Sequence, residues 1–213
     1  MPRRARGGHA DPRTHPRRPA RFQLRFGRGS GKKEGLSPWG APTEDRRGTE
    51  MQPTYTAKVK TLDELVAAVR IVRRQGKRVV FTNGCFDLLH RGHVRYLDQA
   101  KALGDVLIVA INSDASVRAL KGADRPVMSD GERAELVAAL AAVDYVVIFE
   151  ELDPGRVIQA VEPDVLVKGG DWQVDQVVGR QIVEGRGGRV MTLPYVEGAS
   201  SSELLRRIRT GRG

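Results

Sequence analysis

The chain has 213 residues, of which 40% are hydrophobic and 29% are charged. That composition is typical of a folded globular domain with room for a short appendage. Its apolar runs are strand-length, well short of the ~18 residues that a membrane span needs, and its arginine-rich start lacks the apolar segment of a secretory signal. The lone cysteine, Cys85, excludes an internal disulfide. We therefore expect a cytoplasmic protein with no membrane association.

The net charge of +10 is concentrated in residues 1–50, which hold 13 of the 36 Lys and Arg residues and only 5 of the 26 Asp and Glu residues. The same segment holds 8 of the 24 glycines and 6 of the 11 prolines, and it has no hydrophobic period. It cannot bury enough apolar surface to offset its ordering entropy, so we predict a disordered basic tail. A domain over 51–213 follows, and Met51 is an alternative start that would leave the tail untranslated.

The remaining sequence alternates strand-like and helical segments. A capping box of Thr61 and Glu64 opens a helix that ends at Gly76. A second helix is predicted to follow the loop 83–92 and to end at residue 103. Further helices are predicted over 115–120, 130–142, 154–161, 176–184 and 200–208. Strands are predicted over 78–82, 105–112, 145–149, 165–168 and 189–193. This alternation indicates an α/β fold, a Rossmann-like doubly wound parallel sheet whose ligand lies beyond the carboxyl ends of the strands.

The segment 82–93 carries the strongest chemical signal, because it joins the first predicted strand to a helix. His90 and His93 are three residues apart at the start of that helix, so their side chains share one face. A helix N-terminus already attracts phosphate, and two imidazole donors suit a phosphoryl group in transfer. Gly84 and Gly92 permit close backbone approach to a nucleotide. Ordinary loop histidines and a metal pair are the alternatives, although no third histidine in the domain completes a zinc site.

The pattern Gly84-x-Phe86-Asp87-x-x-His90-x-Gly92-His93 resembles the signature of the cytidylyltransferase-like nucleotidyltransferases, whose α/β fold is of the HxGH type. The resemblance extends over about residues 60–209. Matches at 109–122, 125–127, 132–133, 143–146 and 167–171 are similar to one subfamily. Its members are the adenylyltransferases that make ADP-heptose and pyrophosphate from D-glycero-β-D-manno-heptose 1-phosphate and ATP. Many relatives carry a fused sugar kinase, and the absence of a kinase-sized region here implies the stand-alone form.

The resemblance also implies a site. Three residues are expected to be catalytic: His90, His93 and Lys121. The nucleotide is expected to contact Asn83, Gly84, Cys85, Phe86, Asp87, Gly92, Arg133, Gly169, Asp171, Ser200, Ser201 and Ser202. The substrates are the small molecules ATP and a sugar 1-phosphate. Mg²⁺ is expected to arrive with ATP, without a metal site built from protein ligands. Family resemblance further implies a homodimer.

Several of these residues have a simpler explanation. Lys121 can be explained as a solvated lysine at a helix C-terminus, where the helix dipole favours a positive charge. Ser200 with Glu203 matches a capping box. A cation in the first turn of a helix is unfavourable, so Arg133 suggests an anionic partner. Asp87 is expected to orient the loop, because a sugar phosphate arrives already ionised. Catalysis by positioning and charge stabilisation needs no nucleophile, which argues against such a role for Cys85.

The acceptor rests on resemblance alone. A flavin precursor or glycerol 3-phosphate is the alternative, as in FAD synthetases and glycerol-3-phosphate cytidylyltransferases. Tyr195 stands where the latter carry an arginine, which argues against glycerol 3-phosphate. A hypothesis of another class is nucleic-acid binding through the basic tail. The tail has few aromatic residues and no recognisable module, so nucleic acid is not the expected partner.

Overall fold

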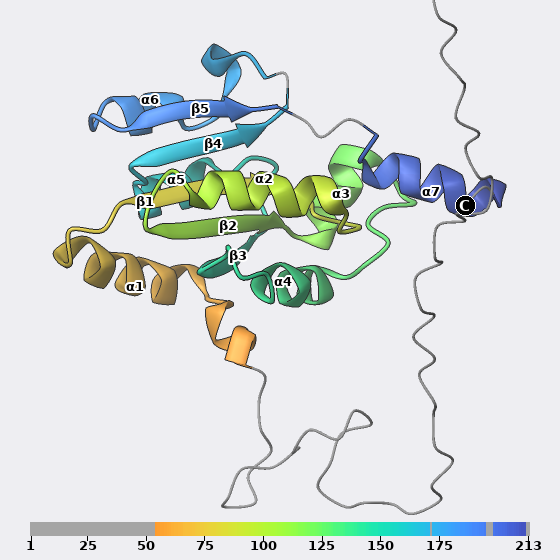
Figure 1. The fold of residues 1–213 in the computed structure, drawn as a ribbon, viewed down its shortest axis with the longest axis horizontal. Helices are drawn as coiled ribbons and strands as arrows, with labels where there is room; N and C mark the ends of the chain where they lie inside the picture. Colours follow the sequence, from red (N-terminus) through yellow and green to blue (C-terminus); the bar gives the residue numbers. More distant parts are fainter. Residues whose placement is uncertain (1–53, 171, 195–197, 212–213) are drawn as a thin grey trace, which may run out of the picture. The chain divides into compact units, whose positions relative to one another are not determined.

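The computed structural model describes residues 54–170, 172–194 and 198–211. The predicted tail therefore lies outside the described residues, as do Asp171 and Tyr195. Five parallel strands form one sheet in the order β3-β2-β1-β4-β5 (Figure 1). The strands are β1 (Val79–Gly84), β2 (Val106–Asn112), β3 (Tyr145–Phe149), β4 (Val165–Gly169) and β5 (Arg189–Leu193).

Helices cover both faces of this sheet, as expected for parallel strands, which need crossover connections. The α-helices are α1 (Leu62–Arg74), α2 (Arg91–Lys101), α3 (Asp114–Lys121), α4 (Asp130–Ala138), α5 (Gly155–Val161), α6 (Arg180–Glu184) and α7 (Ser201–Thr210). Two short 3₁₀ helices, η1 (Thr54–Lys58) and η2 (Val174–Gln176), complete the described elements. The helix α2 crosses in front of the sheet in Figure 1.

Two hydrophobic cores separate cleanly on the two faces, because successive side chains of a strand point in opposite directions. Val79 and Phe81 of β1 pack with residues of α1, α5 and α6. Val80, between them in sequence, packs with residues of α2 and α4. All three are fully buried. At about 25 cal/mol per Å² of buried apolar surface, these cores dominate the stability of the fold.

The order of the strands confirms the predicted doubly wound α/β sheet. From β1 the chain runs outward through β2 and β3, and it then returns to place β4 on the other side of β1. The direction of winding therefore reverses between β1 and β4, where Thr82 lies opposite Val167. Both strands end in glycine, Gly84 and Gly169. A ligand is expected above these two ends.

Three details differ from the predicted elements. Order begins before Thr61, since η1 precedes α1 and Lys60 N–H bonds to Val146 O at 2.8 Å. The helix predicted over 130–142 ends at Ala138, and the Lys58 ammonium binds the carbonyls of Leu140 and Val143 beyond it. The segment 176–184 is interrupted by Gly179, whose φ of +87° is left-handed. No helix in the described ranges has the length and apolar character that a membrane span requires.

Candidate active site

A cavity of about 850 Å³ opens where the sheet changes its direction of winding. It is bounded by the loop after β1, the starts of α2 and α7, and the end of α3. Among its lining residues are thirteen predicted from sequence: Asn83, Gly84, Cys85, Phe86, Asp87, His90, Gly92, His93, Lys121, Gly169, Ser200, Ser201 and Ser202. Arg133 does not line it, and Asp171 is outside the described residues. Residues spread over 120 positions of sequence thus meet at one edge of the sheet, roughly as the parallel topology requires.

The two histidines are stacked on each other at the start of α2. Their ring centroids lie 3.8 Å apart at an interplanar angle of 21°. His90 is the N-cap of α2, and its Nδ1 accepts a hydrogen bond from the Gly92 N–H at 3.1 Å. His93 packs on its other side against Phe86, 5.0 Å between ring centroids. The pair is therefore held in place by stacking and by helix capping.

Both imidazoles are neutral at neutral pH. The pKa of His93 is lowered to about 4, chiefly by burial and also by charge repulsion from His90 and Lys121. Burial also lowers the pKa of His90. A neutral imidazole carries one proton, and because His90 Nδ1 is an acceptor, that proton sits on Nε2. His90 can therefore donate a hydrogen bond to an anionic ligand without itself being charged.

The loop around the histidines leaves no space for larger residues. A Cβ on Gly92 would lie 2.9 Å from the His90 ring and 3.1 Å from Ala199 Cβ. A Cβ on Gly84 would lie 3.0 Å from the Phe86 ring. Phe86 itself has a left-handed φ of 47°, which is rare for a bulky residue and costs conformational energy. Strain of this kind is held by surrounding packing, and it is typical of functional loops.

Asp87 anchors this loop to the segment that precedes α4. Its carboxylate accepts hydrogen bonds from Val127 N–H at 2.7 Å and Met128 N–H at 3.2 Å. It also pairs with Arg125, 2.7 Å from Oδ2 to Nε. Asp87 is buried, and its charge is compensated by these contacts. The geometry makes Asp87 a positioning residue.

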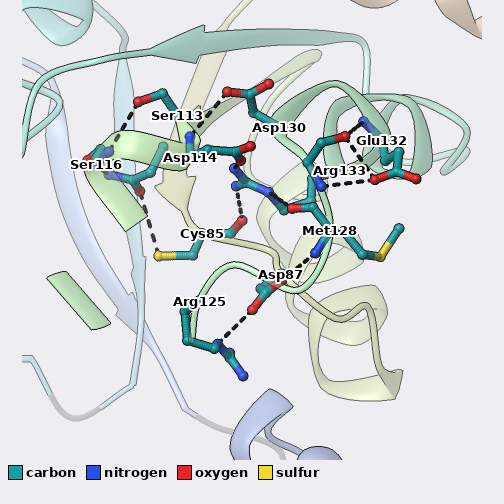
Figure 2. A network of polar contacts seen from close by, with 12 residues as sticks. Cys85, Asp87, Ser113, Asp114, Ser116, Arg125, Met128, Asp130, Glu132 and Arg133 are labelled. Atoms are coloured by element: carbon teal, nitrogen blue, oxygen red, sulfur yellow. Dashed lines mark hydrogen bonds and ion pairs between the residues drawn. The ribbon is translucent and has the colours of Figure 1, made fainter. Parts of the chain in front are cut away.

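Arg133 requires a correction, because it is fully buried and directed into the protein. Its guanidinium donates to Cys85 O at 2.6 Å, Met128 O at 3.0 Å and Asp114 Oδ1 at 2.7 Å (Figure 2). The anionic partner predicted for Arg133 is therefore a side chain of the protein itself, Asp114. Arg133 therefore positions the loop through the Cys85 carbonyl rather than reaching a nucleotide.

The serines at the start of α7 face the cavity. Ser200 is the N-cap, and its Oγ accepts from Glu203 N–H at 3.1 Å. Ser201 Oγ donates to Leu88 O at 3.1 Å, which ties α7 to the histidine loop. The expected capping box is only half formed, because the Glu203 carboxylate pairs with Arg206 at 2.7 Å. The helix N-terminus and its hydroxyls form a place where anions are favoured.

Eight cavity-lining residues are not among the site residues predicted from sequence: Tyr96, Lys168, Trp172, Pro194, Gly198, Ala199, Glu203 and Arg207. Lys168 is the most informative of them. Its Nζ lies 3.1 Å from Asn83 Oδ1 and 5.5 Å from the centre of the Trp172 ring. Burial lowers its pKa. The sequence contained a signal for this residue, because a lysine at the carboxyl end of a predicted apolar strand is placed at the edge of the sheet where ligands bind.

The described part of the chain contains no group of three or more His, Cys, Asp or Glu side chains able to hold a metal ion. The carboxylates that line the cavity, Asp87 and Glu203, are paired with arginines. The remaining charged groups of the lining, Lys121, Lys168 and Arg207, are cationic. The cavity as a whole is therefore suited to a polyanion.

Comparison with known proteins agrees with this geometry. The profile of a family described as "Cytidylyltransferase-like" matches residues 81–207, which include the histidine loop and the start of α7. The chain belongs to the cytidylyltransferase-like family. The described domain is thus a nucleotidyltransferase domain, and its cavity corresponds to the matched region.

Individual relatives share about half of their residues with this chain over the matched region. "Bifunctional protein HldE" of Geotalea uraniireducens is 54% identical over 159 residues, which is 75% of this chain and 32% of the relative. The protein of the same name from Citrifermentans bemidjiense is 53% identical over 152 residues, 71% of this chain and 31% of that protein. The chain therefore spans about a third of the length of the curated relatives that it matches.

A solved structure, the lipopolysaccharide core biosynthesis protein from Thermoplasma volcanium GSS1, has 28% sequence identity to the chain. It aligns over 58% of this chain and all of its own, with a TM-score of 0.49. A TM-score of that size is too low to carry a conclusion about shared function.

Proposed function

We propose that this cytidylyltransferase-like domain is an adenylyltransferase that converts ATP and D-glycero-β-D-manno-heptose 1-phosphate into ADP-heptose and pyrophosphate. The observation that supports it most is the stacked pair His90 and His93, held at the N-terminus of α2 and lining the same cavity as the α7 serines. Hydrogen-bond donors from two helix N-termini converge there, which suits a triphosphate.

The chemical step needs no covalent enzyme intermediate. An oxygen of the acceptor phosphate attacks the α-phosphorus of ATP in line, and the bond from that phosphorus to the β-phosphate oxygen breaks. Pyrophosphate carries away the electron pair. No proton must leave the nucleophile, since a sugar phosphate is ionised at neutral pH. Positioning and charge stabilisation are then sufficient for catalysis.

Each group of the cavity has a role in this scheme. His90 and His93 stabilise negative charge on the transferring and leaving phosphates, and Lys121 neutralises phosphate oxygens from the end of α3. The α7 serines cap the triphosphate. Mg²⁺ would be held chiefly by the phosphates of ATP, because magnesium sites commonly borrow ligands from substrate phosphates, and it would supply neutralisation of charge on the triphosphate. Such an enzyme works where ATP and sugar phosphates are available, so we place it in the cytoplasm.

The choice of a heptose acceptor is supported by the relatives named HldE, which match 75% and 71% of this chain at 54% and 53% identity. Their name states two functions, and the matched third of each relative corresponds to the nucleotidyltransferase domain described here. Glycerol 3-phosphate and flavin mononucleotide remain the alternative acceptors of the same fold, and CTP the alternative nucleotide.

Pyrophosphate release tests the proposal. The chain is incubated with Mg²⁺ and either ATP or CTP, against both anomers of heptose 1-phosphate, glycerol 3-phosphate and flavin mononucleotide. We expect release only with ATP and the β-anomer of the heptose phosphate. Release with another acceptor would contradict the substrate, and no release with any acceptor by protein that binds ATP would contradict the reaction.

A matched variant ties the activity to the site. His93→Ala is expected to reduce turnover about 100-fold or more, the size of the effect when donors to a developing oxyanion are removed. Turnover close to that of the unaltered chain would remove His93 from the catalytic residues. Lys77→Met, an exposed position outside the cavity, serves as the control.

A further inference from the structure

Lys168 is a half-buried cation that forms no ion pair with the described residues. It ends the apolar run of β4 and lies at the edge of the sheet where the winding reverses, next to β1. Its only polar partner among the described residues is the neutral Asn83 amide, at 3.1 Å, and the Trp172 ring lies 5.5 Å away. No carboxylate from the described residues lies within ion-pair distance of it. Among the described residues, the ammonium is therefore partly desolvated without a compensating negative charge.

The contact with Asn83 organises both side chains toward the cavity that they line. Asn83 Oδ1 accepts one proton of the ammonium, which leaves Lys168 two N–H groups to donate. With its oxygen turned to Lys168, the amide of Asn83 presents its two N–H groups elsewhere. Two donors from neighbouring parallel strands are thus held together, and one of them carries a full charge.

An anion is the ligand that this arrangement favours. Desolvation opposes the charged form of Lys168, which is why burial lowers its pKa. A neutral ligand such as a nucleobase offsets little of that cost, whereas a phosphate oxygen makes a charge-assisted hydrogen bond. The cavity therefore contains an anion subsite on the strands β1 and β4, in addition to the donors on the helices α2 and α7.

Transfer between two phosphates requires two such subsites side by side. The helix N-termini, with the histidines and serines, form the one suited to the triphosphate. We propose that Lys168 and Asn83 form the other and bind the phosphate group of the acceptor, so that its oxygen is held against the α-phosphorus of ATP. This assignment rests on the proposed function, since it requires a phosphorylated acceptor.

The test compares the unaltered full-length chain with Lys168→Met, which keeps the length of the side chain and removes its charge. We expect the KM for the heptose 1-phosphate to rise about 10- to 100-fold, the effect of losing a hydrogen bond to a charged group. The Kd for ATP, measured calorimetrically with no acceptor present, is expected to stay within about twofold. Lys168→Arg retains the charge and is expected to recover part of the lost affinity.

Thermal unfolding separates binding from a structural role. Because the half-buried charge has no carboxylate partner among the described residues, Lys168→Met is expected to keep or raise the unfolding midpoint in the absence of ligand. A lower midpoint with equal losses for both substrates would make Lys168 structural. Loss of ATP affinity with an unchanged acceptor KM would assign it to the nucleotide. Either result overturns the proposal.

Binding of inorganic phosphate keeps the test independent of the acceptor's identity. Phosphorus NMR line broadening is followed with a non-hydrolysable ATP analogue already bound. The unaltered chain is expected to broaden the phosphate signal more than Lys168→Met does, and Lys77→Met is expected to match the unaltered chain. If the unaltered chain transfers to no heptose phosphate, the proposed function fails. If the unaltered chain and Lys168→Met also broaden the phosphate signal equally, the proposed phosphate subsite at Lys168 is contradicted as well.

Discussion

At the scale of single residues, His93 links the site to the stability of the fold. Its pKa is about 4 in the folded chain and near 6.5 in the unfolded chain. The folded state thus binds the proton more weakly, so stability is complete above pH 6.5 and is lost as pH falls toward 4. The difference between the two pKa values corresponds to about 3 kcal/mol.

We therefore expect the free energy of unfolding to fall by about 2 to 3 kcal/mol more for the unaltered chain than for His93→Gln between pH 7 and pH 4.5. Urea denaturation at both pH values measures the difference, and comparing the two chains removes the titration of the other groups. If the free energy of unfolding changes equally with pH in the unaltered chain and in His93→Gln, burial does not lower the pKa of His93 as expected.

The buried Arg133 is expected to matter for stability. Arg133→Met leaves Asp114 without its partner and removes donors from the carbonyls of Cys85 and Met128. Removing one partner of a buried ion pair costs about 3 to 5 kcal/mol, so urea denaturation should show a loss of that size.

Arg180→Met is the control for Arg133, because its pair with Glu184 is exposed. It is expected to change the free energy of unfolding by less than about 1 kcal/mol. Stability retained in Arg133→Met, together with lost ATP affinity, would restore Arg133 to the nucleotide-binding residues predicted from sequence.

At the scale of elements, the histidine loop depends on a glycine at the start of α2. The Cβ of Gly92→Ala would press on the His90 ring at 2.9 Å and on Ala199, which precedes α7. We expect turnover to fall about tenfold or more while the protein still folds, because displacements near 1 Å at a reacting centre are costly. Steady-state kinetics and circular dichroism measure the two effects.

Gly131→Ala is the matched control, since it lies in the first turn of α4 with open space around its Cα. Alanine is a better helix former than glycine, and a gain of about 0.5 to 1 kcal/mol in stability with normal turnover is expected there. Equal turnover in both variants would show that the Gly92 contacts do not hold His90 in its working position.

The elements that sequence predicted well are those with strong local causes. The strands over 145–149 and 189–193 have the predicted bounds, and the capping box of Thr61 and Glu64 opens α1 as expected. One of the two errors has a nonlocal cause and the other a local one. The helix α4 ends early beside Lys58, more than 70 residues away in sequence, and the segment 176–184 is interrupted by the left-handed Gly179.

The same distinction explains the site. The histidine loop could be predicted because its residues are contiguous and lie between a strand and a helix. Arg133 was misplaced because its partner, Asp114, comes from a different helix and meets it only in the folded chain. Lys168 was missed because its hydrogen-bond partner, Asn83, lies 85 positions earlier in the sequence. Pairing across parallel strands cannot be read from one segment.

At the scale of the whole molecule, the charge of the chain and its chemistry belong to different parts. Residues 1–50 hold 13 basic and 5 acidic residues. The candidate site and both hydrophobic cores lie within residues 54–211. Because the described residues of both cores lie in this range, we expect the chain from Met51 to Gly213 to fold alone. Its unfolding midpoint and kcat/KM for pyrophosphate release should match those of the full chain.

Nucleic-acid binding by the basic tail predicts a different outcome. Each neutralised phosphate releases counterions, so tail-mediated binding to duplex DNA would weaken steeply with salt and would vanish in the Met51–Gly213 chain. We expect neither chain to retain DNA on a column at about 0.15 M salt. Retention of the full chain alone would make nucleic acid a partner. Equal retention of both chains would place the contact on the domain, whose cavity is already suited to phosphate.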